Sequence, residues 1–302
     1  MHRPTRRDLF AGAAAAVLAR RLEALPLAQL KLGITTDEIA DDVLTAAKFL
    51  RDHNLKWAEV RNIWGRYNTA QPVEKVREAG KILDEHGVKV SIEGTGFFKI
   101  PLPPEGPEGE KILDGQWKLL DASLERARIF GTNTLRIFTF MLARDEQPSA
   151  KSYARIDELL REAARRAKGF RLAVENIGGG HVCSGAESGA FLKRVKEDNV
   201  GLTWDPNNAA QSGEQSFPDG YRKIDPSRIF HIHLRDFKRE AGKVVWLPVG
   251  TGEMDNLGQI RALLKDGFQG TFTLETHWKD PKGPLYSTET SLAGLFKVIE
   301  KV

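Results

Sequence analysis

The architecture of this chain is set by four short apolar runs, Phe170-Arg-Leu-Ala-Val-Glu175, Val200-Gly-Leu-Thr-Trp-Asp205, Ile229-Phe-His-Ile-His233 and Gly270-Thr-Phe-Thr-Leu-Glu275. Each run has the length and composition of a buried strand. The segments between them are long enough for crossover connections, so the strands are expected to be parallel. Parallel strands place their carboxyl ends on one face, where the last residues of the four runs can converge.

The last residue of each run is a type that binds divalent cations. Polar residues are common at strand ends, and a single one would carry little information. Three carboxylates and one imidazole at four successive strands instead predict a metal site for Mn²⁺, Mg²⁺, Co²⁺ or Zn²⁺. The predicted ligands are Glu175, Asp205, His233 and Glu275. His231 shares a strand face with His233, so strand geometry alone does not choose between the two histidines.

Strand and helix patterns alternate from Leu30 onward. The four earlier strands are expected at Leu30–Thr35, Lys56–Asn62, Val88–Glu93 and Thr134–Phe140. Helices are expected at Asp37–His53, Val73–His86, Leu113–Phe130, Tyr153–Lys168, Glu187–Asp198, Asn256–Lys265 and Ser287–Lys301. This alternation predicts a single (β/α)₈ TIM barrel over residues 30–302, with its active site at the carboxyl ends of the strands. A doubly wound sheet is the alternative, but Ile34-Thr-Thr-Asp-Glu38 lacks its glycine-rich phosphate turn.

Composition narrows the function classes. The 302-residue chain is 41% hydrophobic, enough for one large core. Its single cysteine, Cys183, excludes an internal disulfide framework and a cysteine-rich zinc module. Much of the formal charge of +4 lies in the first 28 residues. The remaining charges are interspersed, so no nucleic-acid partner is expected.

Residues 1–29 are expected to be an export signal. Thr5-Arg6-Arg7-Asp8-Leu9-Phe10 resembles the twin-arginine motif, and the apolar stretch Ala11–Ala19 follows it. This pattern predicts a periplasmic or otherwise exported protein. Arg20 and Arg21 interrupt the segment early, and the alternative is an amphipathic N-terminal helix of a cytoplasmic enzyme. No later stretch reaches the ~20 apolar residues of a membrane span, so no stable membrane insertion is expected after processing.

Several motifs resemble those of the sugar phosphate isomerase/epimerase superfamily, the xylose isomerase-like TIM barrels. They are Val174-Glu175-Asn176, Trp204-Asp205, His231-Ile-His233-Leu-Arg235-Asp236 and Leu274-Glu275. Pro248–Glu253 and Gly267–Gly270 are similar to the segments that precede the last strand in many members. The resemblance covers about residues 30–300 and is specific for the superfamily and its metal site. Members include ketose 3-epimerases, inosose dehydratases and endonuclease IV.

The resemblance implies roles for the four strand-end residues. In ketose epimerases the residues matching Glu175 and Glu275 bind one divalent metal and exchange protons with the substrate. Those matching Asp205 and His233 complete the metal shell, and His231 matches a histidine that is not a ligand. The implied function is a metal-dependent sugar or polyol isomerase or epimerase that works through a metal-stabilised enediolate.

Other functions use the same groups. Loss of a β-hydroxyl gives a dehydratase or lyase, and a non-catalytic carbohydrate-binding barrel is a further alternative. An endonuclease acting at abasic sites is disfavoured, because no histidine ends the first four expected strands. The expected partner is an uncharged carbohydrate or polyol, and homo-oligomer formation stays open.

Six residues are predicted to contact the substrate. They are Asn208, Arg235, His181, Glu59, Arg61 and Glu93. Asn208 stands where ketose epimerases carry a substrate-contacting histidine. Instead of contacting substrate, the acidic and basic strand residues, which include Arg136, could form a core ion pair. His181 and Arg235 could instead lie in a solvated loop. Aromatic residues near strand ends either stack on a sugar or anchor loops. These are Trp64, Phe97, Phe98, Trp246 and Trp278.

Overall fold

The structure, a computed structural model, describes residues 30–302. The expected export segment, residues 1–29, lies outside the described residues. Within residues 30–302, no helix is both long and apolar enough to cross a membrane.

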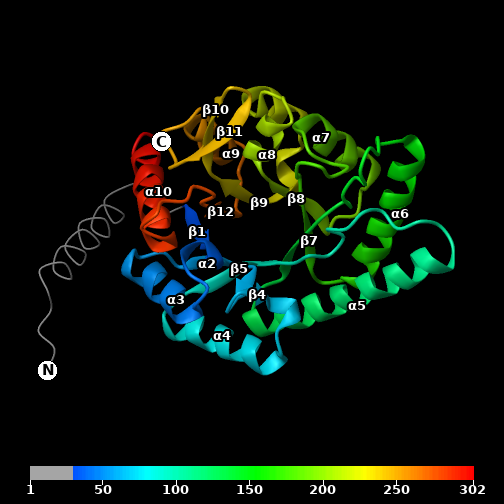
Figure 1. Ribbon diagram of the computed structural model, residues 1–302, viewed down its shortest axis with the longest axis horizontal. Helices are drawn as coiled ribbons and strands as arrows, with labels where there is room; N and C mark the ends of the chain where they lie inside the picture. Colours follow the sequence, from blue (N-terminus) through cyan, green and yellow to red (C-terminus); the bar gives the residue numbers. More distant parts are fainter. Residues whose placement is uncertain (1–29) are drawn as a thin grey trace, which may run out of the picture.

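Eight parallel strands form a closed barrel in the order β1-β12-β9-β8-β7-β6-β5-β2 (Figure 1). The strands are β1 (Lys31–Thr35), β2 (Trp57–Val60), β5 (Lys89–Gly94), β6 (Thr134–Ile137), β7 (Arg171–Glu175), β8 (Val200–Trp204), β9 (Ile229–Leu234) and β12 (Thr271–Leu274). β1 pairs with both β12 and β2, which closes the sheet. The predicted (β/α)₈ barrel is confirmed, and closure excludes the doubly wound alternative.

Helices surround the barrel (Figure 1). The longer ones are α3 (Val43–Asp52), α4 (Val73–Glu85), α5 (Pro107–Phe130), α6 (Ala150–Arg166), α7 (Gly185–Arg194), α9 (Asn256–Lys265) and α10 (Pro284–Ile299). Their apolar faces pack against the outward-facing strand residues, such as Ala58 and Val60 of β2, in one continuous core. Burial of this apolar surface is the main term that favours the fold.

The first expected helix, Asp37–His53, is two helices. α2 (Thr36–Ile39) ends at Ala40, whose backbone is extended, and α3 begins after Asp42. The Asp42 carboxylate accepts a hydrogen bond from the backbone N–H of Thr45 at 2.9 Å, which caps α3. The break separates α3 from α2, whose Asp37 and Glu38 pair with Arg61.

α5 begins six residues before the expected start at Leu113. Pro107 is at its first turn, where a proline lacks only a hydrogen-bond donor that the helix leaves unused. Gly109 allows this start, because a Cβ there would lie 1.7 Å from the carbonyl oxygen of Pro104. The proline- and glycine-rich stretch Pro101–Gly109 is therefore a loop only up to Gly106.

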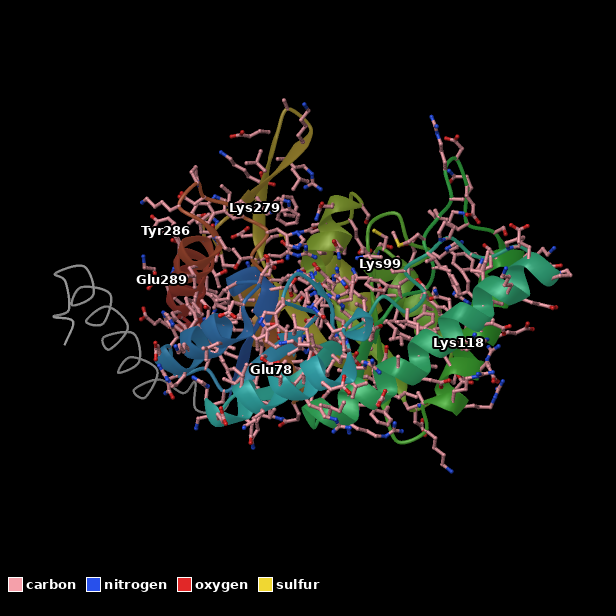
Figure 2. The ribbon with its side chains drawn as sticks, turned by 60° about the horizontal axis from the view of Figure 1, so that its bottom comes forward. Glu78, Lys99, Lys118, Lys279, Tyr286 and Glu289 are labelled. Atoms are coloured by element: carbon pink, nitrogen blue, oxygen red, sulfur yellow. The ribbon has the colours of Figure 1, made fainter. Side chains whose placement is uncertain are left out.

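The remaining elements lie in the connections. They are α8 (Pro206–Gln211), the short helices η2 (Asn68–Ala70), η3 (Ser216–Gly220), η4 (Tyr221–Lys223) and η5 (Pro226–Arg228), and the hairpins β3 (Asn62–Ile63) with β4 (Arg66–Tyr67) and β10 (Asp236–Glu240) with β11 (Lys243–Leu247). The β10–β11 hairpin projects from the barrel in Figure 2. The segment after Arg235, for which a solvated loop was the alternative, is therefore a hairpin. Its turn uses positive φ angles at Ala241 (48°) and Gly242 (76°), as a two-residue hairpin turn requires.

Candidate metal centre

The four predicted metal ligands converge at the carboxyl ends of four adjacent barrel strands. Glu175 ends β7, Asp205 follows β8, His233 lies in β9, and Glu275 follows β12. All four are buried, and one ligand atom from each lies within 4.8 Å of the others. Because β7, β8, β9 and β12 are neighbours in the barrel, the ligands occupy one half of its mouth.

The distances fit a shared ion. The Nδ1 atom of His233 lies 3.5 Å from Glu175 Oε1, 3.7 Å from Asp205 Oδ2 and 3.4 Å from Glu275 Oε2. Donor atoms about 2.0–2.2 Å from one tetrahedral ion are roughly 3.3–3.6 Å apart. His233 Nδ1 and Glu275 Oε2 are buried and have no hydrogen-bond partner in the described structure. A divalent cation would satisfy both atoms, so the residues fit the expected metal.

Glu59 fixes the orientation of the His233 ring. The Nε2 atom of His233 lies 2.7 Å from Glu59 Oε2, and both side chains are fully buried. With Nε2–H donated to this carboxylate, Nδ1 faces the other three ligands and can bind an ion once it has lost its own proton. Metal-binding histidines are commonly oriented by such a carboxylate. The structure therefore places Glu59, predicted as a substrate contact, beneath the histidine.

Arg136 links Glu59, which holds the histidine, to Glu175, one of the predicted metal ligands. Its Nη1 atom lies 3.0 Å from Glu59 Oε1 and 3.3 Å from Glu175 Oε2. The guanidinium is 2% exposed, so its charge acts through little water. His231 lies in the same interior, with Nε2 3.4 Å from Glu59 Oε2. The structure thus places His233, rather than His231, among the three carboxylates.

Asp205 is oriented by the start of α8. Its Oδ1 accepts hydrogen bonds from the backbone N–H groups of Asn207 (2.8 Å) and Asn208 (3.0 Å), which leaves Oδ2 directed at the centre. The Asn208 side-chain amide donates to Asp205 Oδ2 at 3.1 Å. It also lies 3.4 Å from Glu175 Oε1. Asn208, a predicted substrate contact, therefore lies against two of the carboxylates.

Glu275 is flanked by two arginines, Arg61 from the connection after β2 and Arg235 from the end of β9. Arg61 donates to Oε1 at 2.7 Å and also pairs with Asp37 and Glu38. Arg235 pairs with Asp205 and lies 3.4 Å from Glu275 Oε2. Both predicted substrate contacts are thus at the centre, and each is already paired with a carboxylate.

These charges set the ionisation of the carboxyl groups. Burial alone raises the pKa of Glu275, but the charges of Arg235 and His233 outweigh it and hold that pKa well below the usual range. Burial also opposes ionisation of Glu175, while Arg136 and His233 lower its pKa below the usual value. Both groups are therefore carboxylates at neutral pH, able to accept a proton or bind a cation.

Glu93 and His181 lie apart from the centre. Gly94 faces the barrel interior, where a Cβ would lie 2.9 Å from Arg61 Cβ, so the adjacent Glu93 points outward. There burial raises the pKa of Glu93 well above the usual range, with Arg126 and Asn68 opposing this shift. His181 is fully buried, with Nδ1 3.2 Å from the Phe140 carbonyl oxygen. Neither residue is brought to the predicted ligands.

Three of the aromatic residues near strand ends pack against neighbouring side chains. Phe97 and Phe98 are fully buried and pack on each other with ring centroids 3.8 Å apart, so they anchor a loop. Trp246 of the β10–β11 hairpin lies beside Arg235 and His277, with 4.8 Å between the Trp246 and His277 ring centroids. The hairpin thus supports the mouth of the barrel.

A cavity of ≈ 420 Å³ opens beside the centre. Its lining includes Asp37, Glu38, Arg61 and Trp278. A larger cavity, ≈ 490 Å³, is lined by residues at the amino ends of the strands, such as Lys31 and Thr271, which is the end away from the predicted ligands. The cavity beside Glu275 is therefore the better candidate for a substrate.

Three groups at this mouth were missed by sequence reasoning. Asp37 and Glu38 follow the first strand, and His277 lies two residues after Glu275, with Nε2 3.5 Å from Glu275 Oε2. The signal was the one used for the metal ligands, namely polar residues that directly follow a strand.

Comparison with known proteins agrees with this geometry. Residues 47–297 match the family described as Xylose isomerase-like TIM barrel, so the chain belongs to that family. The resemblance inferred from the strand motifs is thereby confirmed. No curated protein sequence matches the chain.

Solved structures share the fold at low sequence identity. The IolI protein with a bound zinc atom is 17% identical, with a TM-score of 0.69 over 90% of this chain and 99% of that one. D-psicose 3-epimerase in the presence of D-fructose is 18% identical, with a TM-score of 0.67 over 90% and 100%. The 3-keto-D-glucoside 4-epimerase from E. coli is 15% identical, with a TM-score of 0.66 over 89% and 99%. At sequence identities this low, the structural similarity shows that the proteins share the barrel fold and shows nothing more.

Proposed function

We propose that this protein is a divalent-metal-dependent isomerase or epimerase of an uncharged sugar or polyol. The observation that carries the proposal is a pair of buried carboxylates, those of Glu175 and Glu275, whose oxygens lie 3.5 and 3.4 Å from His233 Nδ1. Family membership and the sugar epimerases among the structural neighbours support it.

The two carboxylates suit proton transfer next to a carbonyl. When bound, a divalent cation would polarise the substrate carbonyl and stabilise the negative charge of the enediolate. One glutamate removes the proton from the carbon beside the carbonyl. If the other glutamate returns a proton to the opposite face of that carbon, the carbon is inverted. Delivery of the proton to the former carbonyl carbon, with a proton passing between the two oxygens, gives isomerisation instead.

The arginines keep both glutamates ready for this step. Arg136 lies 3.3 Å from Glu175, and Arg61 donates to Glu275 at 2.7 Å. Each pairing favours the ionised form that accepts a proton, and each uses one carboxylate oxygen while the other faces the centre. Asn208 lies against Glu175 but has no titratable proton near neutral pH, so in this proposal it orients groups and transfers no proton.

A dehydratase or lyase is the second candidate function. It uses the same glutamate to remove the proton, and a β-hydroxyl then leaves from the enediolate. Arg235 and His277 contact each other and lie near Glu275, where they offer donors to a departing oxygen. The products distinguish the two, because only elimination gives a product lighter by one water.

The test combines deuterium exchange with one isosteric variant. The metal-loaded protein is incubated in deuterated water with D-fructose and a panel of other free sugars, and isomers and exchanged hydrogens are measured. Glu275→Gln retains a side-chain oxygen but loses the proton acceptor, so we expect turnover to fall by ~10²-fold or more. Metal content should stay close to that of the unaltered protein.

Glu93→Gln is the matched control. It alters a fully buried barrel glutamate that faces away from the centre, and its activity should equal that of the unaltered protein. A Glu275→Gln variant that retains full activity on a sugar that the protein turns over would refute the two-carboxylate mechanism.

A further inference from the structure

The metal ligands leave half of the barrel mouth to the substrate. All four come from the arc β7-β8-β9-β12, whereas β6, β5, β2 and β1 complete the closed barrel and supply none. A substrate that binds the ion from its open side therefore extends over the second half. Residues that follow these four strands are the candidates for its remaining contacts.

Lys99 is a cation of that half without an ion-pair partner among the described residues. It lies in the connection after β5, which is four strands from β9 in either direction around the barrel. Arg61 and Arg136, which also lie on this half, are each paired with carboxylates. The Lys99 ammonium instead lies 4.8 Å from the ring centroid of Phe138, and within residues 30–302 it has no ion-pair partner.

The backbone that carries Lys99 is firmly anchored. Phe98 has a φ angle of 61°, a conformation that non-glycine residues seldom adopt without support. Its ring stacks on Phe140 at 4.1 Å, and its backbone N–H donates to Gln116 Oε1 at 2.8 Å. Strained residues held in this way occur often at binding sites. The turn therefore presents the Lys99 ammonium group from a well-anchored backbone.

The ammonium lies near the metal centre, because the Phe138 ring that it contacts is also 5.5 Å from the Arg136 guanidinium, which lies 3.3 Å from Glu175 Oε2. Burial lowers the pKa of Lys99, and the charges that act on it most are those of Glu175, Arg136, Glu275 and Arg61, all of which belong to that centre. In Figure 2, Lys99 lies near the middle of the molecule, whereas Glu78 and Lys118 lie on the outer helices α4 and α5.

The charges around the centre indicate what Lys99 binds. The carboxylates there are six, namely Asp37, Glu38, Glu59, Glu175, Asp205 and Glu275. The three arginines paired with them, Lys99 and one divalent cation supply an equal positive charge. No excess positive charge remains to attract a phosphate, so a neutral hydroxyl is the group that matches the Lys99 donor.

We infer that Lys99 is a substrate-binding residue that donates a hydrogen bond to a hydroxyl of an uncharged polyhydroxylated substrate, from the side of the barrel opposite Arg235. This inference rests on the proposed function and adds a specificity-determining contact to it. The contact removes no proton, so its loss should weaken substrate binding more than it slows the chemical step.

The first experiment locates Lys99 without any substrate. Lysines of the full chain are reductively methylated with ¹³C-formaldehyde, and the Lys99 resonance is assigned by its absence in Lys99→Arg. Loading with paramagnetic Mn²⁺ should broaden this resonance more than that of Lys118, whereas Mg²⁺ should not broaden it. Equal broadening of the two resonances would overturn the inference.

The second experiment measures kinetics on a sugar that the unaltered protein turns over. Lys99→Met should raise KM by about tenfold or more, as expected for loss of a hydrogen bond from a charged donor, with a smaller change in kcat. Lys99→Arg should restore part of the loss. Lys75→Met is the matched control, because Lys75 also lies 4.8 Å from an aromatic ring, that of Trp64, but pairs with Glu78.

The outcomes separate this inference from the proposed function. An unchanged KM in Lys99→Met, or a fall in thermal stability that accounts for the loss, would overturn the role of Lys99 while leaving the metal chemistry intact. If the unaltered protein turns over no sugar, the proposed function fails, and the Lys99 inference is withdrawn with it whatever the resonance shows.

Discussion

At the scale of single residues, the two nitrogens of His233 have different partners. Nε2 is held by Glu59 at 2.7 Å, and Nδ1 faces three carboxylate oxygens at 3.4–3.7 Å. One ring thereby connects an interior ion-pair network to the predicted metal position. We expect Glu59 to keep a proton on Nε2, so that Nδ1 is the nitrogen that gives up its proton to bind an ion.

Glu59→Gln should weaken metal binding. A glutamine amide can donate to Nε2, which places the ring proton on Nδ1, where it blocks the ion. We expect the affinity for Mn²⁺ or Zn²⁺ to fall ~10–100-fold, the usual effect of removing such a partner. Calorimetric titration measures the affinity, with Glu93→Gln as the control. An affinity equal to that of the unaltered protein would show that Glu59 does not orient His233.

Metal binding should also depend on pH through His233. Burial lowers the pKa of this histidine, but Glu59, Glu275 and Glu175 outweigh burial and raise the pKa to about 10 in the metal-free protein. A proton therefore occupies the ring at neutral pH and must leave before the ion binds. Apparent affinity should rise about tenfold per pH unit up to about pH 10, because proton and metal compete for one nitrogen.

Calorimetry at pH 7 in buffers of different ionisation enthalpy measures this exchange. About one proton should be released for each ion bound. The glutamate ligands contribute little to the release, since their lowered pKa values leave them ionised at that pH. Binding without proton release, at an affinity independent of pH, would contradict the expectation.

At the scale of elements, the start of α5 depends on one glycine. A Cβ at Gly109 would lie 1.7 Å from the Pro104 carbonyl oxygen, whereas a Cβ at Gly115 in the same helix would meet nothing within 4 Å. Gly109→Ala should therefore destabilise the protein by about 1–3 kcal/mol through overpacking. Gly115→Ala should stabilise it by roughly 0.5–1 kcal/mol, because alanine favours the helix.

Chemical denaturation of the two variants provides the comparison. The two substitutions should change the free energy of unfolding in opposite directions. The glycines share one helix, so the difference reflects only their surroundings. If Gly109→Ala is as stable as the unaltered protein, the close approach of Pro104 does not constrain the helix start.

At the scale of the whole molecule, the metal should stabilise the barrel. Its four ligands, from Glu175 to Glu275, come from four different strands. Three of these ligands are carboxylates, which repel one another when no ion is bound. An ion at 100 times its Kd contributes about 2.7 kcal/mol to stability. For a domain of this size that corresponds to a rise in Tm of roughly 5 °C.

Thermal unfolding with and without a chelator tests this link. Restoring Mn²⁺ after chelation should recover the Tm. His233→Ala should show almost no change on chelation, since it lacks the ligand at the centre of the site. A chelator effect of the same size in this variant would place the stabilising ion elsewhere.

The sequence by itself determined the barrel and the position of the candidate metal site. Strand and helix periodicity is a local property of the chain, and parallel strands in a closed barrel necessarily bring their carboxyl ends together. Glu175, Asp205, His233 and Glu275 each end a strand pattern, so their convergence followed from the topology alone. The split of Asp37–His53 and the early start of α5 were missed because they depend on a cap at Asp42 and a close contact at Gly109.

Only the tertiary structure decided which partner each polar side chain has. Glu59 and His233 are 174 residues apart, and Arg61 and Glu275 are 214 apart, so no local pattern relates either pair. The outward orientation of Glu93 depends on the register between neighbouring strands. The physical reason is that secondary structure is set by near neighbours in the chain, whereas ion pairs, burial and pKa values are set by neighbours in space.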